Sequence, residues 1–190
     1  MKNSNNMKWF CNLMLKLGGW ESVGEMAPEK HCIYLEAPHT SIWDFLIGYW
    51  YYRAKGGKLT VMIKKEAFVF PFGPLLKALG GFPIDRKNPQ GTIRDLINEM
   101  EKPDGKSIHL AICPEGTRKP VRKWKTGYHL IAKAAGIPVY VTIVDWGHKK
   151  TGIVQKVELT DDARADTDRI QKIYADLGVI GKHPERFVTQ

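Results

Sequence analysis

The chain has 190 residues, 43% of them hydrophobic, which suffices for one domain with a sizeable core and a small appendage. Its 29 Lys and Arg outnumber its 20 Asp and Glu, and the net charge of +9 suits an anionic partner: nucleic acid, an acidic membrane surface or a phosphorylated substrate. Its three widely spaced cysteines argue against a disulfide framework and fit a reducing cytosol.

The first predicted element is an amphipathic helix over 7–20, which Gly18 and Gly19 bring to an end. The pattern predicts either a helix packed on its own domain or an interfacial helix, with Trp9 and Trp20 as anchors at anionic headgroups. Residues 1–20 are therefore a candidate membrane-surface anchor, followed by one domain over 21–190. The apolar face of the predicted helix consists of Phe10, Leu13, Met14 and Leu17.

From residue 31 onward, apolar strands alternate with helices, which predicts an α/β fold whose mostly parallel or mixed sheet is covered by helices. The longest apolar run, 67–84, holds three prolines and three glycines, so we expect no membrane span. No secretory signal pattern is present, so we expect an intracellular protein. The predicted strands are 31–37, 59–63, 82–85, 107–113, 138–144 and, as an edge strand, 152–159. The predicted helices are 41–54, 71–80, 90–101, 126–136 and 163–178, before an irregular tail over 181–190.

A histidine and an aspartate flank the start of the helix predicted at 41–54. Ser41-x-x-Asp44 matches a capping box, which explains Ser41 and Asp44 without a catalytic role. His39 is left unexplained, at a strand-to-helix junction where parallel α/β sheets bind their ligands. With a carboxylate one helical turn away, His39 can accept a proton from an alcohol. Spacing alone leaves the two interpretations open.

Two other predicted strands also end in polar turns. In the turn 113–120, Gly116 permits close backbone approach, Thr117 offers a hydroxyl and Arg118 a forked donor suited to phosphate. The alternative is a solvated basic loop, against which the carboxylate of Glu115 argues. The segment 80–87 ends in Asp85-Arg86, which alone indicates a turn with a surface ion pair.

The segments HTSIWD (39–44), GGFPIDR (80–86) and PEGTR (114–118) lie in this order, each at a predicted strand end. Together they resemble the motifs of the glycerolipid acyltransferase family, whose best-known members are the lysophosphatidic acid (1-acylglycerol-3-phosphate) acyltransferases. Pro138 matches a proline that the family carries in a later apolar strand, and the resemblance covers about residues 38–140. Pro38 is a departure, because an asparagine often precedes the histidine in relatives.

This resemblance implies a role for each matching residue. His39 is implied as the general base that deprotonates the acceptor hydroxyl, with Asp44 as its orienting partner and no covalent acyl-enzyme. Arg86 and Arg118 are implied to bind the acceptor's phosphate, while the turn 115–117 shapes the site. No metal or cofactor is implied beyond the co-substrate, which is acyl-CoA or an acyl carrier protein thioester.

The implied function is transfer of a fatty acyl group to the free hydroxyl of a monoacylated lipid in phospholipid biosynthesis. Lysophosphatidic acid is the default acceptor, and a lyso-aminolipid without phosphate is the alternative. Residues 67–84 or 42–52 are expected to line a channel for the acyl chain. We expect a cytoplasmic enzyme that is peripheral at the inner face of the membrane, while acyl length and oligomeric state stay open.

A function of a different class is nucleic-acid binding. The segment YWYYRAKGGK (49–58) interleaves aromatic and basic residues, as base stacking and phosphate contacts require. This interpretation leaves His39, Asp44 and the turn 115–118 without a purpose. An inactive lipid-binding relative is a third alternative.

Overall fold

The computed structural model describes residues 2–85, 87–103 and 105–189. Within these residues, one sheet is built from the strands β1 (Glu21–Val23), β2 (His31–Ala37), β3 (Leu59–Lys64), β4 (Gly81–Ile84), β5 (Ile108–Ile112), β6 (Val139–Asp145) and β7 (Lys150–Val157). Their order is β1-β7-β6-β2-β5-β3-β4, and every neighbouring pair is parallel except the antiparallel β6–β7 pair. The predicted α/β fold with a mixed sheet is confirmed.

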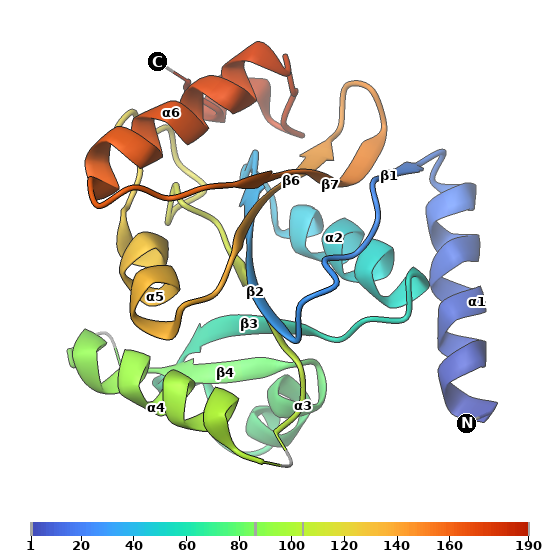
Figure 1. The fold of residues 1–190 in the computed structure, drawn as a ribbon. Coiled ribbons are helices and arrows are strands. Elements are labelled where there is room, and N and C mark those ends of the chain that lie inside the picture. The colour runs from blue at the N-terminus through green and yellow to red at the C-terminus, as the bar shows by residue number, and fades with distance from the viewer. Residues whose placement is uncertain (1, 86, 104, 190) are drawn as a thin grey trace.

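Helices cover both faces of this sheet (Figure 1). They are α1 (Lys2–Leu17), α2 (Ile42–Ala54), α3 (Phe72–Ala78), α4 (Pro89–Glu101), α5 (Gly127–Ala135) and α6 (Ala163–Asp176), with 3₁₀ turns at Lys65–Ala67 and Pro184–Arg186. On one face, α1 and α2 enclose a core that includes Tyr51 and Tyr52. On the other face, α4, α5 and α6 enclose a core that includes Tyr128 and Tyr174. No helix of the described chain combines the length and the apolar character that crossing a bilayer needs.

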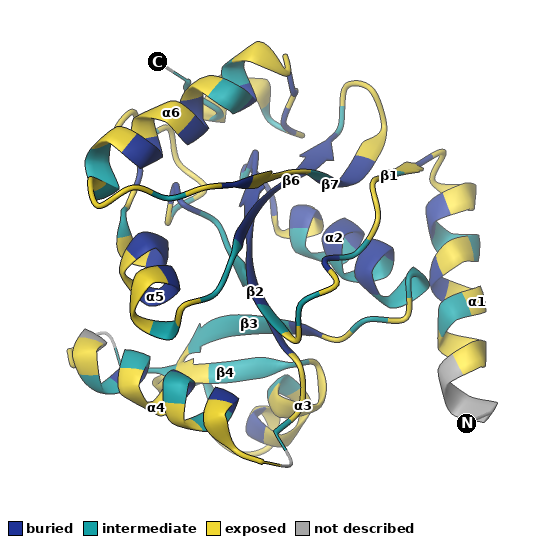
Figure 2. Cartoon of the chain, in the orientation of Figure 1, coloured by how far each residue is buried: buried dark blue, intermediate teal, exposed yellow. Residues whose placement is uncertain are grey.

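The two halves of the sheet differ in how completely they are covered. Strands β2 and β6 are buried almost throughout, as their continuous apolar sequences predict for central parallel strands. Strands β3 and β4, at the other edge, stay mostly half-exposed (Figure 2). This incomplete cover leaves room for a cavity beside the carboxyl ends of the strands.

The N-terminal helix packs on α2 through a face that lies beside the predicted apolar face. Cys11 and Leu15 are buried there, and the Asn12 side chain donates a hydrogen bond to the carbonyl of Ala54. Of the predicted face, Phe10 and Leu17 are exposed, while Leu13 and Met14 are half-buried. The helix therefore has a packing face and, next to it, an exposed apolar face. The prediction of Trp20 as an anchor at the headgroups is wrong, because Trp20 is buried against Trp146.

The prediction of an edge strand at 152–159 is wrong in one respect. The short strand β1, which sequence periodicity did not reveal, pairs with Lys150–Gly152 of β7 and covers that end of the strand. Gly152, at φ 146°, permits this pairing, because a Cβ there would lie 2.0 Å from the carbonyl oxygen of Val23.

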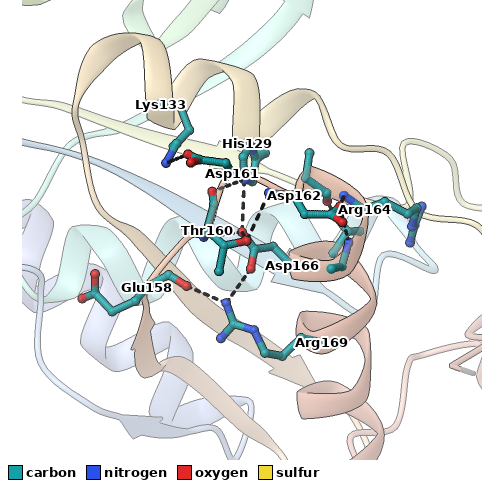
Figure 3. Close-up of polar contacts among 12 residues, drawn as sticks. His129, Lys133, Glu158, Thr160, Asp161, Asp162, Arg164, Asp166 and Arg169 are labelled. Carbon is teal, nitrogen blue, oxygen red and sulfur yellow. Dashed lines mark hydrogen bonds and ion pairs between the residues drawn. The ribbon is translucent and has the colours of Figure 1, made fainter.

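A satisfied polar cluster joins α5 to α6 (Figure 3). His129 Nε2 lies 3.1 Å from Asp166 Oδ2 and 3.1 Å from the carbonyl oxygen of Thr160. Because a carbonyl oxygen only accepts, Nε2 carries the proton. The backbone N–H of Thr160 and the Arg169 guanidinium complete the shell of Asp166. His129 is thus a core histidine that fixes α6 on the domain.

Candidate active site

The sheet topology brings two of the three polar turns together. Strands β2 and β5 are parallel neighbours, so the residues that follow them meet at one edge of the sheet. His39 follows β2, and the turn 113–118 follows β5. Strand β4 ends at the same edge, and Asp85 after it lines the same cavity as His39. Arg86, predicted as a phosphate ligand, lies outside the described residues.

His39 lies at the wall of this cavity with its side chain 23% exposed. Burial lowers the pKa of its imidazole; the negative charge of Asp44 raises it, and the positive charge of Arg118 lowers it further. The imidazole is therefore neutral near pH 7, as a general base requires. Its Nδ1 is buried and has no hydrogen-bond partner in the described part of the chain.

Asp44 is fully buried, and both of its carboxylate oxygens accept hydrogen bonds. Oδ2 accepts hydrogen bonds from the backbone N–H groups of Thr40 and Ser41, each at 2.7 Å, and Ser41 completes the capping box. Oδ1 accepts the indole N–H of Trp146 at 2.8 Å. Oδ2 lies 3.9 Å from His39 Nδ1, too far for a hydrogen bond but close enough for a charge interaction. The predicted capping box is confirmed, and the same carboxylate lies beside the histidine.

Glu115 connects the second turn to the histidine loop. Its Oε2 accepts the backbone N–H of His39 at 2.8 Å, while Oε1 is buried without a partner among the described residues. Burial raises the pKa of Glu115 to about 8; the His39 N–H opposes that rise and the charge of Asp44 adds to it. Glu115 therefore positions the backbone of His39, a geometry that spacing alone did not reveal.

The other residues of the turn differ in exposure. Gly116 has φ 66°, and a Cβ there would lie 2.8 Å from the Lys125 side chain, so glycine lets that side chain lie across the turn. Thr117 Oγ1 accepts the backbone N–H of Lys119 at 3.2 Å and stabilises the turn. The Arg118 side chain is exposed and remains available for an anionic ligand. Pro138 immediately precedes β6, and its carbonyl accepts the N–H of Ile33.

A large apolar cavity of about 840 Å³ adjoins His39. Both segments predicted to line an acyl channel contribute to it: Phe45 from α2, and Leu76 and Ile84 from 67–84. Next to Leu76, four apolar side chains are more than half exposed. We call them the α3 patch: Val69, Phe70, Phe72 and Leu75.

Trp146 and a C-terminal segment, which the sequence patterns did not predict, also hold the loop 38–41 that carries His39. Trp146, just after β6, does so through its bond to Asp44. The C-terminal segment is 180–186, where the N–H of His183 donates to Thr40 Oγ1 and Arg186 donates to the Thr40 carbonyl, each at 3.2 Å. Neither segment has a local pattern that reveals a contact with residues 38–44, because both contacts arise from tertiary packing. Within the described residues, no three metal-ligating side chains cluster.

Comparison with known proteins gives one family and several relatives. Residues 21–144 match the family model described as Acyltransferase. The chain is 34% identical over 121 residues to the 1-acyl-sn-glycerol-3-phosphate acyltransferase of Pseudomonas aeruginosa, which covers 60% of this chain and 44% of that protein. It is 36% identical over 107 residues to the protein of the same name from Streptococcus pneumoniae, covering 55% of this chain and 38% of that protein. The chain thus spans less than half the length of these curated relatives.

A solved structure shares the fold. It is the 1-acyl-sn-glycerophosphate (LPA) acyltransferase PlsC from Thermotoga maritima, with a TM-score of 0.58 over 90% of this chain and 76% of that chain. The sequences are 18% identical, so this likeness concerns the fold alone. Trp146 and the segment 180–186 lie beyond the matched family segment, which ends at residue 144.

Proposed function

The chain belongs to the glycerolipid acyltransferase family, and from this premise we propose that it transfers a fatty acyl group from an acyl thioester to the free hydroxyl of a lysophosphatidic-acid-like acceptor. One observation carries the proposal. A neutral histidine, a buried carboxylate and a turn with an exposed arginine meet at the wall of an apolar cavity. This reaction needs a base with a negative charge beside it. It also needs a cationic side chain that binds the acceptor's anionic group and an apolar space large enough for a lipid chain.

In the proposed reaction, the imidazole of His39 takes the proton of the acceptor hydroxyl while the hydroxyl oxygen bonds to the thioester carbonyl carbon. The carbon–sulfur bond breaks, and the leaving thiolate takes the proton from the imidazolium. The products are an ester and a free thiol. Asp44, at 3.9 Å, stabilises the imidazolium through its charge, and Glu115 holds the His39 backbone.

For the acceptor, the exposed Arg118 supports a phosphate group, and we extend the same role to Arg86 from the motif that it completes. A lyso-aminolipid without phosphate has no comparable use for Arg118. For the donor, the net charge of +9 supports an acidic acyl carrier protein, and acyl-CoA carries phosphates that suit the same charge. We propose that both thioesters are accepted.

The aromatic residues that suggested nucleic-acid binding are not available to stack on bases. Tyr51 and Tyr52 are buried in the core between α2 and the sheet, and Tyr49 and Trp50 are half-buried. These side chains therefore do not form an exposed stacking surface. The aromatic run is explained by packing.

We propose that the protein works as a peripheral protein at the inner face of the membrane, where a monoacylated acceptor resides. Two exposed apolar surfaces support such docking. The α3 patch adjoins the cavity, and Trp9, Phe10 and Leu17 are exposed on α1. Docking through the α3 patch brings the cavity to the bilayer, so we assign it the main contact and α1 a secondary one.

The proposal is tested by measuring thiol release and ester formation with detergent-dispersed lysophosphatidic acid and acyl-CoA or acyl carrier protein thioester. His39→Ala should abolish both signals while circular dichroism shows an unchanged fold. His31→Ala, at the opposite end of β2, is the matched control and should retain activity. Monoacylglycerol, which lacks the phosphate, should be a poor acceptor. A folded His39→Ala variant with wild-type turnover would rule out the mechanism.

A further inference from the structure

A second carboxyl group, at Glu36, faces the cavity and has no part in the proposed reaction. Glu36 is the penultimate residue of β2 and is 9% exposed. In the described part of the chain its carboxyl group makes no hydrogen bond or ion pair, although buried polar groups are ordinarily paired. It lines the large cavity and also a small adjoining void of about 20 Å³.

The walls around Glu36 are mostly apolar, although Thr142 and Thr151 also line the small void. Leu59 and Ala111 line the same two spaces beside it. On α2, Gly48 makes room for the carboxyl group, because a Cβ there would lie 2.5 Å from Glu36 Oε2. The fold thus accommodates a carboxyl group in a mostly apolar wall without giving it a hydrogen-bond partner from the described residues.

At neutral pH this carboxyl group is mostly protonated. Burial raises the pKa of Glu36 to about 8; the negative charge of nearby Asp44 acts in the same direction, as does Glu115 when it is ionised. A neutral carboxylic acid both donates and accepts a hydrogen bond. Its natural ligand in an apolar space is therefore an uncharged group that does both, such as an aliphatic hydroxyl.

The position of Glu36 along the cavity decides which part of a substrate it meets. It precedes His39 by three residues, so the two Cα atoms are at most about 11 Å apart. The thioester carbon must react beside His39. Because Glu36 lines the same cavity, an acyl chain that enters the cavity from there can bring one of its first carbons to Glu36.

We propose that Glu36 forms a hydrogen-bonding subsite for a hydroxyl group near the thioester end of the donor's acyl chain, so that the enzyme prefers hydroxyacyl over unsubstituted acyl donors. The inference rests on the proposed function, because it assumes that the cavity holds the acyl chain. It concerns a residue outside the His39, Asp44 and 115–118 set. A chain without the hydroxyl leaves the carboxyl group unpaired in the complex, which favours the hydroxylated donor.

The test compares kcat/KM for 3-hydroxyacyl-CoA and acyl-CoA of equal length, with lysophosphatidic acid in detergent. The wild type should prefer the hydroxylated donor by about tenfold or more, since sites built around a hydrogen bond discriminate against ligands that lack it. Glu36→Gln keeps a donor and an acceptor and should retain the preference. Glu36→Met, of similar length, should bring the ratio close to one. Moving the hydroxyl to the far end of the chain should also remove the preference.

Three results would overturn the subsite: equal kcat/KM for the two donors in the wild type, an unchanged ratio in Glu36→Met, or a preference only for a hydroxyl on the acceptor's chain. If the wild type turns over neither donor, the proposed function fails, and a binding assay decides on the subsite. This assay measures how well 3-hydroxy and unsubstituted fatty acids displace a fluorescent fatty acid from the wild type and from Glu36→Met. Equal competition by the two acids on the wild type contradicts the subsite.

Discussion

The position of Asp44 is compatible with both of the interpretations that its sequence position left open. The residue closes the capping box of α2 and lies 3.9 Å from His39. The two interpretations do not compete, because the N–H groups that the carboxylate caps belong to the loop that carries the histidine. Capping α2 therefore also fixes the loop, so the proposed role of Asp44 beside His39 depends on the same hydrogen bonds as its capping role.

Arg118 provides the sharpest residue-level test of acceptor recognition. Arg118→Ala should raise the KM for lysophosphatidic acid by about ten- to a hundredfold, since a charge-assisted contact contributes about 1.5–3 kcal/mol. The KM for the thioester should change little. Lysine should rescue only part of the loss, because it lacks the fork. Lys119→Ala, the exposed neighbour, is the control, and equal effects of Arg118→Ala on both substrates would refute the assignment.

The raised pKa of Glu36 predicts how stability depends on pH. Between pH 4.5 and about 8 the folded state keeps a proton that the unfolded state releases, so this group's contribution to stability falls as pH rises and levels off above 8. The slope approaches about 1.4 kcal/mol per pH unit for one group. Glu36→Gln should therefore gain stability relative to wild type from pH 5 to pH 8.

Urea unfolding from pH 5 to pH 9 measures this difference, and the exposed Glu158→Gln is the control. Comparing variants cancels the opposite effect of histidines such as His109, whose pKa is lowered by burial. Parallel stability curves for Glu36→Gln and wild type would contradict the prediction.

At the scale of elements, local patterns predicted which strands and helices form and where the two central polar turns lie. The reason is that β2 and β5 are mostly buried parallel strands with largely apolar sequences, and their carboxyl ends necessarily share an edge. The three-residue strand β1 and the contact of Trp146 with Asp44 have no such pattern. Each depends on a pairing between distant residues, which no local periodicity encodes.

We therefore expect Trp146, in the turn after β6, to affect the rate of the proposed reaction through its hydrogen bond to Asp44. Trp146→Phe keeps an aromatic side chain but removes the N–H that binds Asp44 Oδ1, so it should lower kcat about tenfold with little change in the acceptor KM. The cost in stability should be about 1–3 kcal/mol, because a buried carboxylate oxygen loses its donor.

Trp20→Phe is the matched control, since Trp20 packs edge-on against Trp146, with ring centroids 5.0 Å apart, and has no bond to Asp44. If both variants lose kcat equally, packing of the indole pair rather than the hydrogen bond explains the effect.

At the scale of the whole molecule, apolar exposure is concentrated beside the less covered half of the sheet. Phe70 is 90% exposed, and its neighbours in the α3 patch are all more than half exposed. Phe70→Ser with Phe72→Ser should reduce co-sedimentation with anionic liposomes more than tenfold, since each buried phenylalanine contributes about 1.5–3 kcal/mol. Activity on bilayer-held acceptor should fall, and activity on detergent-dispersed acceptor should persist.

Trp9→Ser with Phe10→Ser, on the exposed face of α1, should have a smaller effect. These point variants are preferable to deleting α1, because Cys11 and Leu15 contribute to packing on α2. If the Phe70→Ser, Phe72→Ser variant pellets normally and the Trp9→Ser, Phe10→Ser variant does not, α1 rather than the α3 patch is the main docking surface.

The contacts of Thr40 with His183 and Arg186 have a consequence for biosynthesis. His39, Asp44 and the turn 115–118 leave the ribosome well before residues 180–186, which brace the loop that carries the histidine. A nascent or proteolytically clipped chain that ends at residue 179 would contain every motif residue and most of the core. Its histidine loop would lack this brace. The proposed acyl transfer should therefore be slower in such a chain than in one whose tail is in place.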